Sequence, residues 1–315
     1  PFFFHAPAAI RHSSTSRGLG DVYKRQGFIG SRLCDLLEKK GHEIIRVSRK
    51  IDQLSTNDSF CDLETDTIDN RFMLNVNSIF HLAGYSHDLS NPEDAKDRYY
   101  NLNVRATKNL AIQAAENGVK KFIFISSVKA ASVESNDNSG IKNLGIYGET
   151  KREAELELAK LSKETDMKVC IIRPSLVYGS GVKGNLLSMR NAIQNGWFPS
   201  LPEIKNIKSM VHVDDLVRAI FFVLEKGMDQ EIYNVTDGKN YSTTEIYETF
   251  CLLANKKPSM FRIPLFFIKM MSYLPSGLGH RVKKLLDNER HSSTKIESLG
   301  YHAELSLENF NETLF

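Results

Sequence analysis

Residues 27–50 read GFIGSRLCDLLEKKGHEIIRVSRK. This stretch contains a glycine turn, a helical segment and an extended segment, in that order. In the helical segment, Ser31–Lys40, the leucines fall on one face, and Gly41 ends the helix. The extended segment, Glu43–Val47, contains isoleucine and valine, which favour strands. A turn, a helix and a strand in this order predict one βα unit of a parallel sheet.

The same alternation continues toward the C-terminus. The later segments predicted as strands are Ser78–Leu82, Lys121–Ser126 and Lys168–Ile172, and those predicted as helices are Asn103–Glu116 and Tyr147–Thr165. Strands that alternate with helices predict an α/β fold with a Rossmann-type doubly wound parallel sheet, which we place in residues 27–178.

The second half of the chain differs from the first in composition and in the order of its predicted strands and helices. Glycine and asparagine cluster at 179–185 and 237–240, and the strand–helix alternation loosens. We therefore expect residues 179–315 to form mainly a smaller substrate lobe, with a return to the core near residues 211–236. The apolar segment 261–274 is interrupted by charged residues and a proline, so it is predicted to belong to this lobe and not to span a membrane.

The turn at the start of the quoted stretch is typical of dinucleotide binding. Gly27, Phe28, Ile29 and Gly30 open a helix, where glycines allow the backbone to approach a pyrophosphate and the helix to pack on its strand. Taken alone, the motif also fits an ordinary tight turn. Lys24 stands where a third glycine is expected, and its side chain would obstruct that approach.

The residues before this turn look foreign. Residues 16–26 read SRGLGDVYKRQ, which resembles the in-frame translation of a sequencing-library adapter; the alternative is a divergent natural strand and turn. Residues 1–10 are apolar but lack the features of a secretory signal. We expect residues 1–26 to be foreign and the natural first strand to be missing. If residues 19–26 are drawn into its place, they should pack it badly, because they contain four polar or charged side chains at 21 and 24–26.

The second predicted strand ends without a carboxylate. An acidic residue at this position usually holds the ribose 2′-hydroxyl of NAD, whereas here Ser48 is followed by Arg49 and a lysine. A hydroxyl and cations suit the 2′-phosphate of NADP. The alternative is a solvated strand end, so both NAD and NADP stay open as the cofactor.

A tyrosine, a lysine and a serine form the candidate catalytic group. Tyr147 and Lys151 are four residues apart, which places both on one face of a helix. The ammonium can stabilise a phenolate and lower the pKa of the phenol from about 10, which makes Tyr147 a usable general acid and base. Ser127 follows an apolar strand, where its hydroxyl can bind a reacting sugar oxygen. The three together are more specific than any one of them.

With these motifs, the chain resembles the extended short-chain dehydrogenase/reductase superfamily, in particular the NAD-dependent epimerase/dehydratase family that acts on nucleotide sugars. The resemblance runs from Gly27 nearly to the C-terminus and includes residues 81–84 (HLAG), 101–107 (NLNVRAT) and 173–179 (RPSLVYG). In the second of these segments alanine replaces the usual glycine. The branch it resembles most is associated with bacterial surface-polysaccharide synthesis.

The resemblance implies roles for further residues. Asn103 would be the structural member of a catalytic tetrad. The implied cofactor contacts are Asp62, Leu63, Leu82, Ala83, Gly84, Lys151 and Pro174, and the implied contacts to a nucleotide diphosphate sugar are Ser127, Asn185 and Lys208. Lys208 stands where an arginine is common, so it would give a point charge in place of a bidentate fork.

The resemblance also implies a reaction. Tyr147 would exchange a proton with the sugar C4 oxygen while hydride passes between C4 and the nicotinamide. A UDP-sugar 4-epimerase is the first interpretation, and an NADPH-dependent 4-keto reductase of a UDP-deoxysugar is the second. Val128 and Lys129 stand where a dehydratase carries its extra acid and base, which argues against dehydration. A dinucleotide-binding regulator without turnover is the non-enzyme alternative.

The composition narrows the partners. The chain has 315 residues and a net charge of +3, with no run of like charges, so we expect neither nucleic acid nor an anionic membrane as a partner. Its four cysteines are scattered without metal-ligand spacing, which predicts reduced thiols, no metal and a cytoplasmic protein. We expect no membrane span, and a homodimer stays open.

Overall fold

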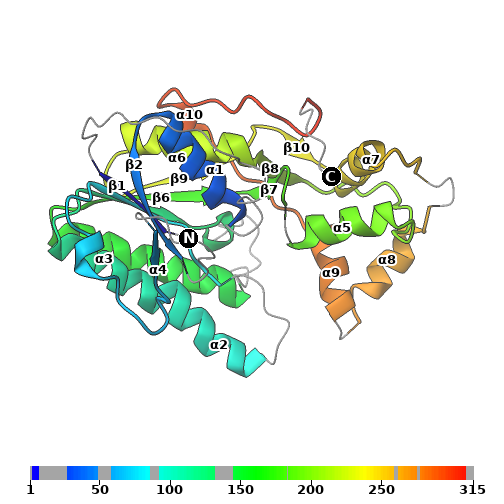
Figure 1. Ribbon diagram of the computed structural model, residues 1–315. Coiled ribbons are helices and arrows are strands. Elements are labelled where there is room, and N and C mark those ends of the chain that lie inside the picture. Colours follow the sequence, from blue (N-terminus) through cyan, green and yellow to red (C-terminus); the bar gives the residue numbers. More distant parts are fainter. Residues whose placement is uncertain are drawn as a thin grey trace. The chain divides into compact units, whose positions relative to one another are not determined.

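The structure, a computed structural model, describes residues 2–6, 27–48, 58–85, 92–131, 145–182, 184–258, 262–274 and 277–309 (Figure 1). The chain divides into two compact units. Unit 1 comprises Pro1–Pro174 and Val217–Asn234, and unit 2 comprises Ser175–Leu216 and Val235–Phe315.

A seven-stranded sheet in the order β3-β2-β1-β4-β5-β6-β9 forms the centre of unit 1. Its strands are β1 (Phe2–Ala6), β2 (Glu43–Ser48), β3 (Asp58–Phe60), β4 (Ser78–His81), β5 (Lys121–Ile125), β6 (Lys168–Pro174) and β9 (Glu231–Val235). β4 pairs with β5 and β5 with β6 in parallel, as does β2 with β3. The predicted α/β class with a parallel sheet is therefore confirmed.

The central position, which we expected to lack its natural strand, holds β1 (Phe2–Ala6). β1 runs antiparallel to both β2 and β4, with Phe2 opposite Val47 and His81. A gap between two strands leaves two rows of unpaired backbone groups, and an aromatic segment with high strand propensity can pair with both. Residues 19–26, which we considered for this position, lie outside the described residues.

The direction of β1 has a consequence for the connection to the first helix. Ala6 lies opposite Glu43, the first residue of β2, and His5 lies opposite Ser78, the first residue of β4. β1 therefore ends at the amino edge of its neighbours, whereas a dinucleotide-binding turn leaves the first strand at their carboxyl edge. β1 does not lead directly into Gly27.

Helices cover both faces of this sheet. Figure 1 shows α2 (Pro92–Tyr100), α3 (Ala106–Glu116) and α4 (Gly145–Glu164) on one face, with α1 (Phe28–Lys39) and α6 (Val213–Lys226) on the other. On the second face, the ring of His42 lies 5.7 Å from that of Phe221 in α6.

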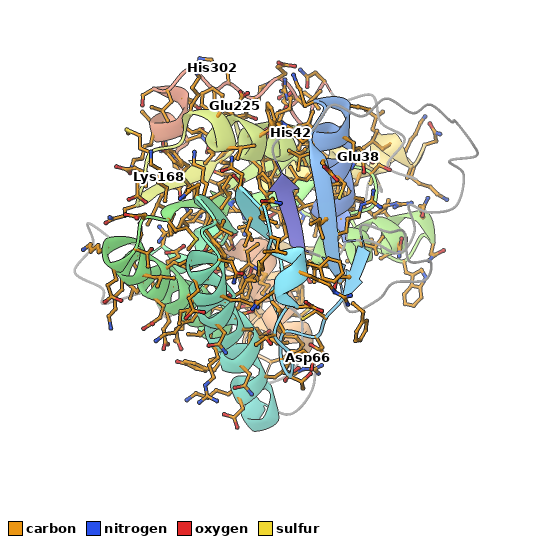
Figure 2. All side chains as sticks on the ribbon, turned by 60° about the vertical axis from the view of Figure 1, so that its left-hand side comes forward. Glu38, His42, Asp66, Lys168, Glu225 and His302 are labelled. Carbon is orange, nitrogen blue, oxygen red and sulfur yellow. The ribbon has the colours of Figure 1, made fainter. Side chains whose placement is uncertain are left out.

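His42 and Glu225 are labelled on this side of the sheet in Figure 2. Burial lowers the pKa of His42, and the Glu225 carboxylate opposes this shift.

The burial of the central strands in unit 1 explains why β4, β5 and β6 could be predicted from the sequence. β4 and β5 are almost entirely buried, and Phe122, Phe124, Ile79 and Val169 have no exposed surface. Strands buried on both faces read as continuous apolar runs. The short helix α2, before the predicted helix start at Asn103, was missed because its sequence, PEDAKDRYY, shows no apolar periodicity.

Unit 2 contains a small sheet and several helices. The sheet order is β10-β8-β7, formed by β7 (Leu176–Tyr178), β8 (Lys208–His212) and β10 (Asn240–Tyr241). β7 and β8 are parallel, and β8 and β10 are antiparallel. The helices are α5 (Gly184–Gln194), α7 (Thr243–Leu253), α8 (Leu265–Met271), α9 (Gly277–Leu286) and α10 (Thr294–Glu297). Ser242 and Glu245 form a capping box at the start of α7.

The segment predicted to return to the core is divided between the two units. Residues 208–212 form β8 in the small sheet, and residues 217–234, which include most of α6, belong to unit 1. No helix in the described parts of the chain is long and apolar enough to cross a membrane.

Candidate active site

Ser127 lies just beyond the carboxyl end of β5. The strand ends at Ile125, and Ser127 is the N-terminal cap of a 3-10 turn, Val128–Ala130. Its backbone is extended, and its Oγ accepts a hydrogen bond of 3.2 Å from the amide of Lys129. Since β5 is buried, the strand holds this hydroxyl at a fixed position on the sheet edge.

Asn103 ties the loop after β4 to helix α4. It lies in a π-helical turn, Asn101–Arg105, between α2 and α3, and its side chain is fully buried. Its Oδ1 accepts from the Tyr85 amide at 2.6 Å, and its Nδ2 donates to the Tyr85 carbonyl at 3.1 Å and to Thr150 Oγ1 at 3.0 Å. π-turns are frequent at functional sites. Asn103 thus fixes the register of α4, which carries the tyrosine and the lysine.

Lys151 is buried on the inner face of α4. Its ammonium donates to the carbonyl of Ile125 at 3.0 Å and lies 4.5 Å from the centre of the Phe124 ring. Burial lowers the pKa of Lys151 to about 8, and the nearby carboxylate of Glu155 opposes this shift. The site therefore holds a cation whose charge is sensitive to mildly alkaline pH.

Gly84 makes room for this cation. A Cβ at residue 84 would lie 2.9 Å from Lys151 Nζ and 3.2 Å from Asn103 Oδ1. Any larger residue would displace one of these groups. The loop after β4, α4 and the π-turn therefore meet at a point where a side chain at residue 84 would move Lys151 from its position.

Tyr147 lies one helical turn before Lys151. The nearby Ser127 side chain lowers its pKa, but burial has the larger effect and raises the pKa to about 12. The expectation that Lys151 lowers the pKa of Tyr147 is wrong for this state of the protein. Lys151 donates instead to the Ile125 carbonyl, and the desolvation of the phenol dominates.

A buried carboxylate that the sequence analysis missed lies one turn beyond Lys151. Glu155 Oε1 accepts from Ser126 Oγ at 2.6 Å and from Arg173 Nε at 2.8 Å, and Oε2 accepts from Arg173 Nη2. The network joins β5, α4 and β6. The spacing that joins Tyr147 to Lys151 repeats from Lys151 to Glu155, and that repeat was the signal available in the sequence.

The predicted cofactor residues lie on elements that share one edge of the sheet. Because β1 is antiparallel to both β2 and β4, these two strands are parallel to each other, and their carboxyl ends lie on the same side as those of β5 and β6. Ser48, Pro174 and residues 82–84 follow or end these strands. Ligands of doubly wound sheets bind at this edge.

The glycine turn fits a bound anion at the start of α1. Gly27 is the N-terminal cap; within the described residues no side chain caps this helix end, and its first turn carries no acidic residue. The amide groups of such a helix end can bind a phosphate. Together with the glycine at 84, these features fit a nicotinamide dinucleotide. Arg49, predicted to contact a 2′-phosphate, lies outside the described residues.

The adenine contact was predicted for the loop after β3. Asp62 is partly buried there, and its Oδ1 accepts from the Glu64 amide at 3.2 Å. Leu63 packs against the hydrophobic core of unit 1. Both residues follow the carboxyl end of a strand parallel to β2, and their contact with adenine stays a prediction.

The two predicted substrate contacts in unit 2 differ in exposure. Asn185 is exposed in the first turn of α5, whereas Lys208 is buried. The Lys208 ammonium donates to the carbonyl of Lys284 at 2.9 Å and lies 3.6 Å from Glu289 Oε1. As described, Lys208 has structural partners within its unit, and its contact with a diphosphate stays a prediction.

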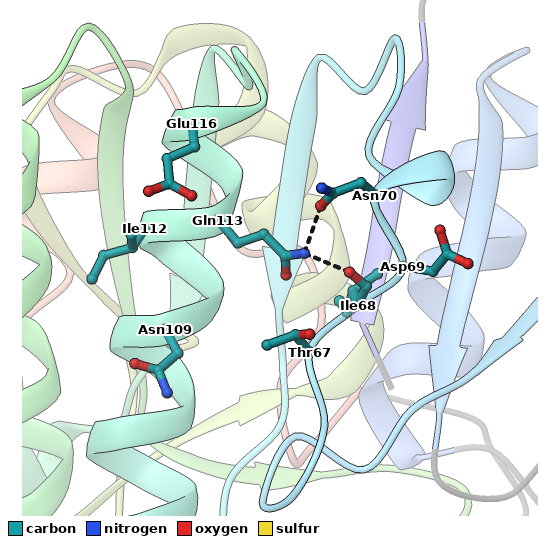
Figure 3. A pocket seen from close by; sticks show the side chains of 8 residues that line it. All are labelled: Thr67, Ile68, Asp69, Asn70, Asn109, Ile112, Gln113 and Glu116. Carbon is teal, nitrogen blue, oxygen red and sulfur yellow. Dashed lines mark hydrogen bonds between the residues drawn. The ribbon is translucent and has the colours of Figure 1, made fainter.

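A surface pocket of about 490 Å³ between α3 and the segment before β4 is separate from these residues (Figure 3). Gln113 donates to the Ile68 carbonyl and, at 2.9 Å, to Asn70 Oδ1 across it. The pocket contains no nucleophile beside a base. Within the described ranges no cluster of three potential metal ligands occurs.

A mainly parallel α/β sheet, with serine, tyrosine, lysine and asparagine on the elements at its carboxyl edge, is typical of an extended short-chain dehydrogenase. The comparisons with known proteins give the family: the chain belongs to the NAD dependent epimerase/dehydratase family, whose sequence profile matches residues 25–236. The family predicted from the sequence is therefore confirmed.

Curated relatives and solved structures agree with this assignment. The chain is 30% identical over 306 residues to the UDP-glucose 4-epimerase of Vibrio cholerae, covering 91% of this chain and 92% of that protein. It is 28% identical over 228 residues to N-acetyl-alpha-D-glucosaminyl-diphospho-ditrans,octacis-undecaprenol 4-epimerase of Escherichia coli O157:H7, covering 66% and 68%. The UDP-glucose 4-epimerase structure from Thermotoga maritima has a TM-score of 0.69 at 23% identity, with coverage of 90% and 92%, and shows the same fold.

Proposed function

We propose that this chain is an NAD(P)-dependent UDP-sugar 4-epimerase. The observation that carries the proposal is the buried Lys151 one turn beyond Tyr147 on the same helix, with the Ser127 side chain close enough to lower the pKa of that phenol. A binding module has no need of a phenol placed beside a buried ammonium and a strand-end hydroxyl. The relatives in Vibrio cholerae and Escherichia coli, both named as 4-epimerases, support the same reaction.

The residues divide the chemistry among them. Tyr147 exchanges a proton with the sugar C4 oxygen, and Ser127 holds that oxygen by a hydrogen bond. Lys151 contributes a positive charge that favours the phenolate when its ammonium faces the site, and Asn103 keeps α4 in place. A bound nicotinamide supplies the acceptor and donor of hydride at C4.

The pKa shifts show what substrate and cofactor must overcome. Burial raises the pKa of the Tyr147 phenol to about 12 and lowers that of Lys151 to about 8. The charged forms of both groups are therefore disfavoured by burial. A ligand that draws the Lys151 ammonium from the Ile125 carbonyl toward the phenol would stabilise both charges at once.

The binding residues proposed for the cofactor lie in unit 1. They are Gly27, Phe28, Ile29, Gly30, Ser48, Arg49, Asp62, Leu63, Leu82, Ala83, Gly84, Lys151 and Pro174. For the nucleotide diphosphate sugar we propose Ser127, Asn185 and Lys208.

We also propose that the protein is a homodimer and that it lies in the cytoplasm. Light scattering of the purified protein would test the oligomeric state, and cell fractionation would test the location.

A 4-keto reductase is the second candidate. It is favoured by the absence of a carboxylate at the end of β2, where Ser48 suits NADP, and by the 29% identity over 198 residues to dTDP-4-dehydro-6-deoxyglucose reductase of Escherichia coli. The two candidates share every catalytic residue and differ in whether the cofactor is consumed.

Cofactor accounting separates the two candidates. The purified protein is given UDP-glucose or UDP-N-acetylglucosamine, and C4 inversion is followed by NMR while nicotinamide absorbance is recorded. The epimerase predicts inversion without net change in reduced cofactor. Stoichiometric loss of NADPH with a 4-keto sugar, and no inversion, would establish the reductase instead.

A further inference from the structure

Helix α8 and the turn after it carry a cluster of exposed apolar side chains. Phe266, Phe267, Met270, Tyr273 and Leu274 are 71%, 50%, 53%, 86% and 48% exposed, and we call these five residues the α8 face. Of the eleven large apolar side chains exposed in the described residues, these five fall within nine consecutive positions. The rings of Phe266 and Phe267 pack edge to face, with centroids 5.8 Å apart.

The α8 face is continuous because of helical spacing. The exposed side chains are spaced three or four residues apart, in two series: 266, 270 and 273, and 267, 270 and 274. They therefore line one side of the helix and of the turn that follows it. Ile268, only 5% exposed, points the other way and anchors α8 in unit 2. Single exposed apolar residues are common on protein surfaces, but a contiguous apolar cluster is typical of a surface that binds a membrane or another protein.

The charge around the α8 face indicates what covers it. Residues 249–286 contain no aspartate or glutamate and seven lysines or arginines: Lys256, Lys257, Arg262, Lys269, Arg281, Lys283 and Lys284. The net charge of the whole chain is only +3, so the rest of the chain is net negative. Lys256, Lys257, Lys269 and Lys283 are exposed, and Arg262 pairs with Glu248, which lies just before this stretch.

We propose that the α8 face docks on an anionic phospholipid bilayer, with the two phenylalanines entering the headgroup and acyl boundary. Exposed phenylalanine, methionine and leucine flanked by lysine, without carboxylates, is the pattern of helices that lie in a membrane interface. The attachment is peripheral, since α8 has only seven residues. The inference does not depend on the reaction proposed above.

This proposal differs from the expectation drawn from the net charge. The overall value of +3 hides the basic stretch because acidic residues elsewhere offset it. Within about a Debye length of a surface the local charge determines attraction, and each lysine or arginine near an anionic bilayer contributes about fivefold to binding.

Vesicle flotation of the full chain tests the proposal. The chain should float with vesicles of phosphatidylcholine mixed with phosphatidylglycerol, and much less with phosphatidylcholine alone. Phe266→Ser combined with Phe267→Ser should reduce binding at least about tenfold, since two buried rings are lost. Lys269→Gln combined with Lys283→Gln should reduce it roughly fivefold per charge.

Matched controls come from unit 1. Phe60 is 62% exposed on β3 and Lys120 is exposed before β5, so Phe60→Ser and Lys120→Gln should leave flotation unchanged. Thermal melts verify that each variant is folded. Flotation that is absent, or equal in the α8 and control variants, overturns the proposal. Light scattering that shows a dimer lost only in the phenylalanine variant, without vesicle binding, also overturns it, because a second copy then covers the face.

Discussion

At the scale of single residues, Glu155 connects the catalytic helix to the sheet. Its carboxylate accepts hydrogen bonds from Ser126 and Arg173 and lies one turn from Lys151. A buried carboxylate between a buried arginine and a buried lysine compensates two charges that would otherwise be costly in the interior. Glu155 is thus a positioning residue for the site.

We expect Glu155→Gln to lower the free energy of unfolding by about 3 kcal/mol, because Arg173 would keep its charge in the interior without a partner carboxylate. The alkaline limb of the activity profile should move to lower pH, since Glu155 raises the pKa of Lys151. Urea melts and a pH–rate profile measure the two effects.

Glu157 provides the matched control on the same helix. It pairs with Lys108 at 2.6 Å on the surface, so Glu157→Gln should cost less than about 1 kcal/mol and leave the profile in place. Equal losses in the two variants would show that Glu155 has no special role.

Asp237 is a half-buried carboxyl group in unit 2. Burial raises its pKa to about 6, although Tyr241 donates a hydrogen bond to it at 2.7 Å. A carboxyl group whose pKa is raised in the folded state binds its proton more tightly there than in the unfolded chain. Ionised Asp237 therefore lowers the stability of the fold above about pH 6. This cost shrinks as the pH falls from about 6 toward the ordinary aspartate range, where the carboxyl group is protonated in both states.

Asp237→Asn should remove this dependence. We expect the variant to gain about 1–3 kcal/mol at neutral pH relative to the parent chain, with the advantage shrinking near pH 4. Urea melts across this pH range measure it, with the exposed Asp66→Asn as the control. A constant difference between parent and variant at every pH would contradict the assigned cause.

At the scale of elements, the direction of β1 limits how well the proposed cofactor-binding site can form. Phe2–Ala6 fills the central position in reverse, so its end lies at the amino edge of β2 and β4, and twenty residues separate it from Gly27. The tight strand-to-helix turn that brings backbone amides to a pyrophosphate needs a parallel strand that ends beside Gly27.

Replacing residues 1–26 with an apolar strand that ends in Thr-Gly-x-x should therefore strengthen cofactor binding and raise the melting temperature. The new strand could run parallel to β2 and β4 and lead directly into α1. Thermal melts and cofactor titrations of the two chains measure the effect. Equal behaviour would show that residues 1–26 are a working natural segment.

At the scale of the whole molecule, the three strands β4, β5 and β6 of unit 1 were predictable because they are buried on both faces. Burial on two sides demands an apolar run, and β4, β5 and β6 read as such runs directly. The proposed catalytic residues could be picked out for a related reason: helical spacing and strand ends are local properties of the sequence.

Other features depend on contacts between distant segments and could not be read in this way. The reversed β1 arises from two neighbouring strands that leave a gap, and the π-turn at Asn103 arises from its bonds to Tyr85 and Thr150. The raised pKa of Tyr147 reflects burial in the folded state, which no spacing reports. The basic stretch around α8, by contrast, was visible in the sequence, but the net charge of the whole chain did not reveal it because acidic residues elsewhere offset it.

The central claim is that Tyr147 moves the proton in the inversion of a sugar at C4. The most direct test compares the rate of UDP-sugar inversion by the parent chain and by Tyr147→Phe, with Tyr233→Phe on β9 as the control. The account predicts a loss of at least about a hundredfold in Tyr147→Phe, with cofactor affinity and melting temperature nearly unchanged, and near-normal turnover in the control. Near-normal inversion by Tyr147→Phe would contradict it.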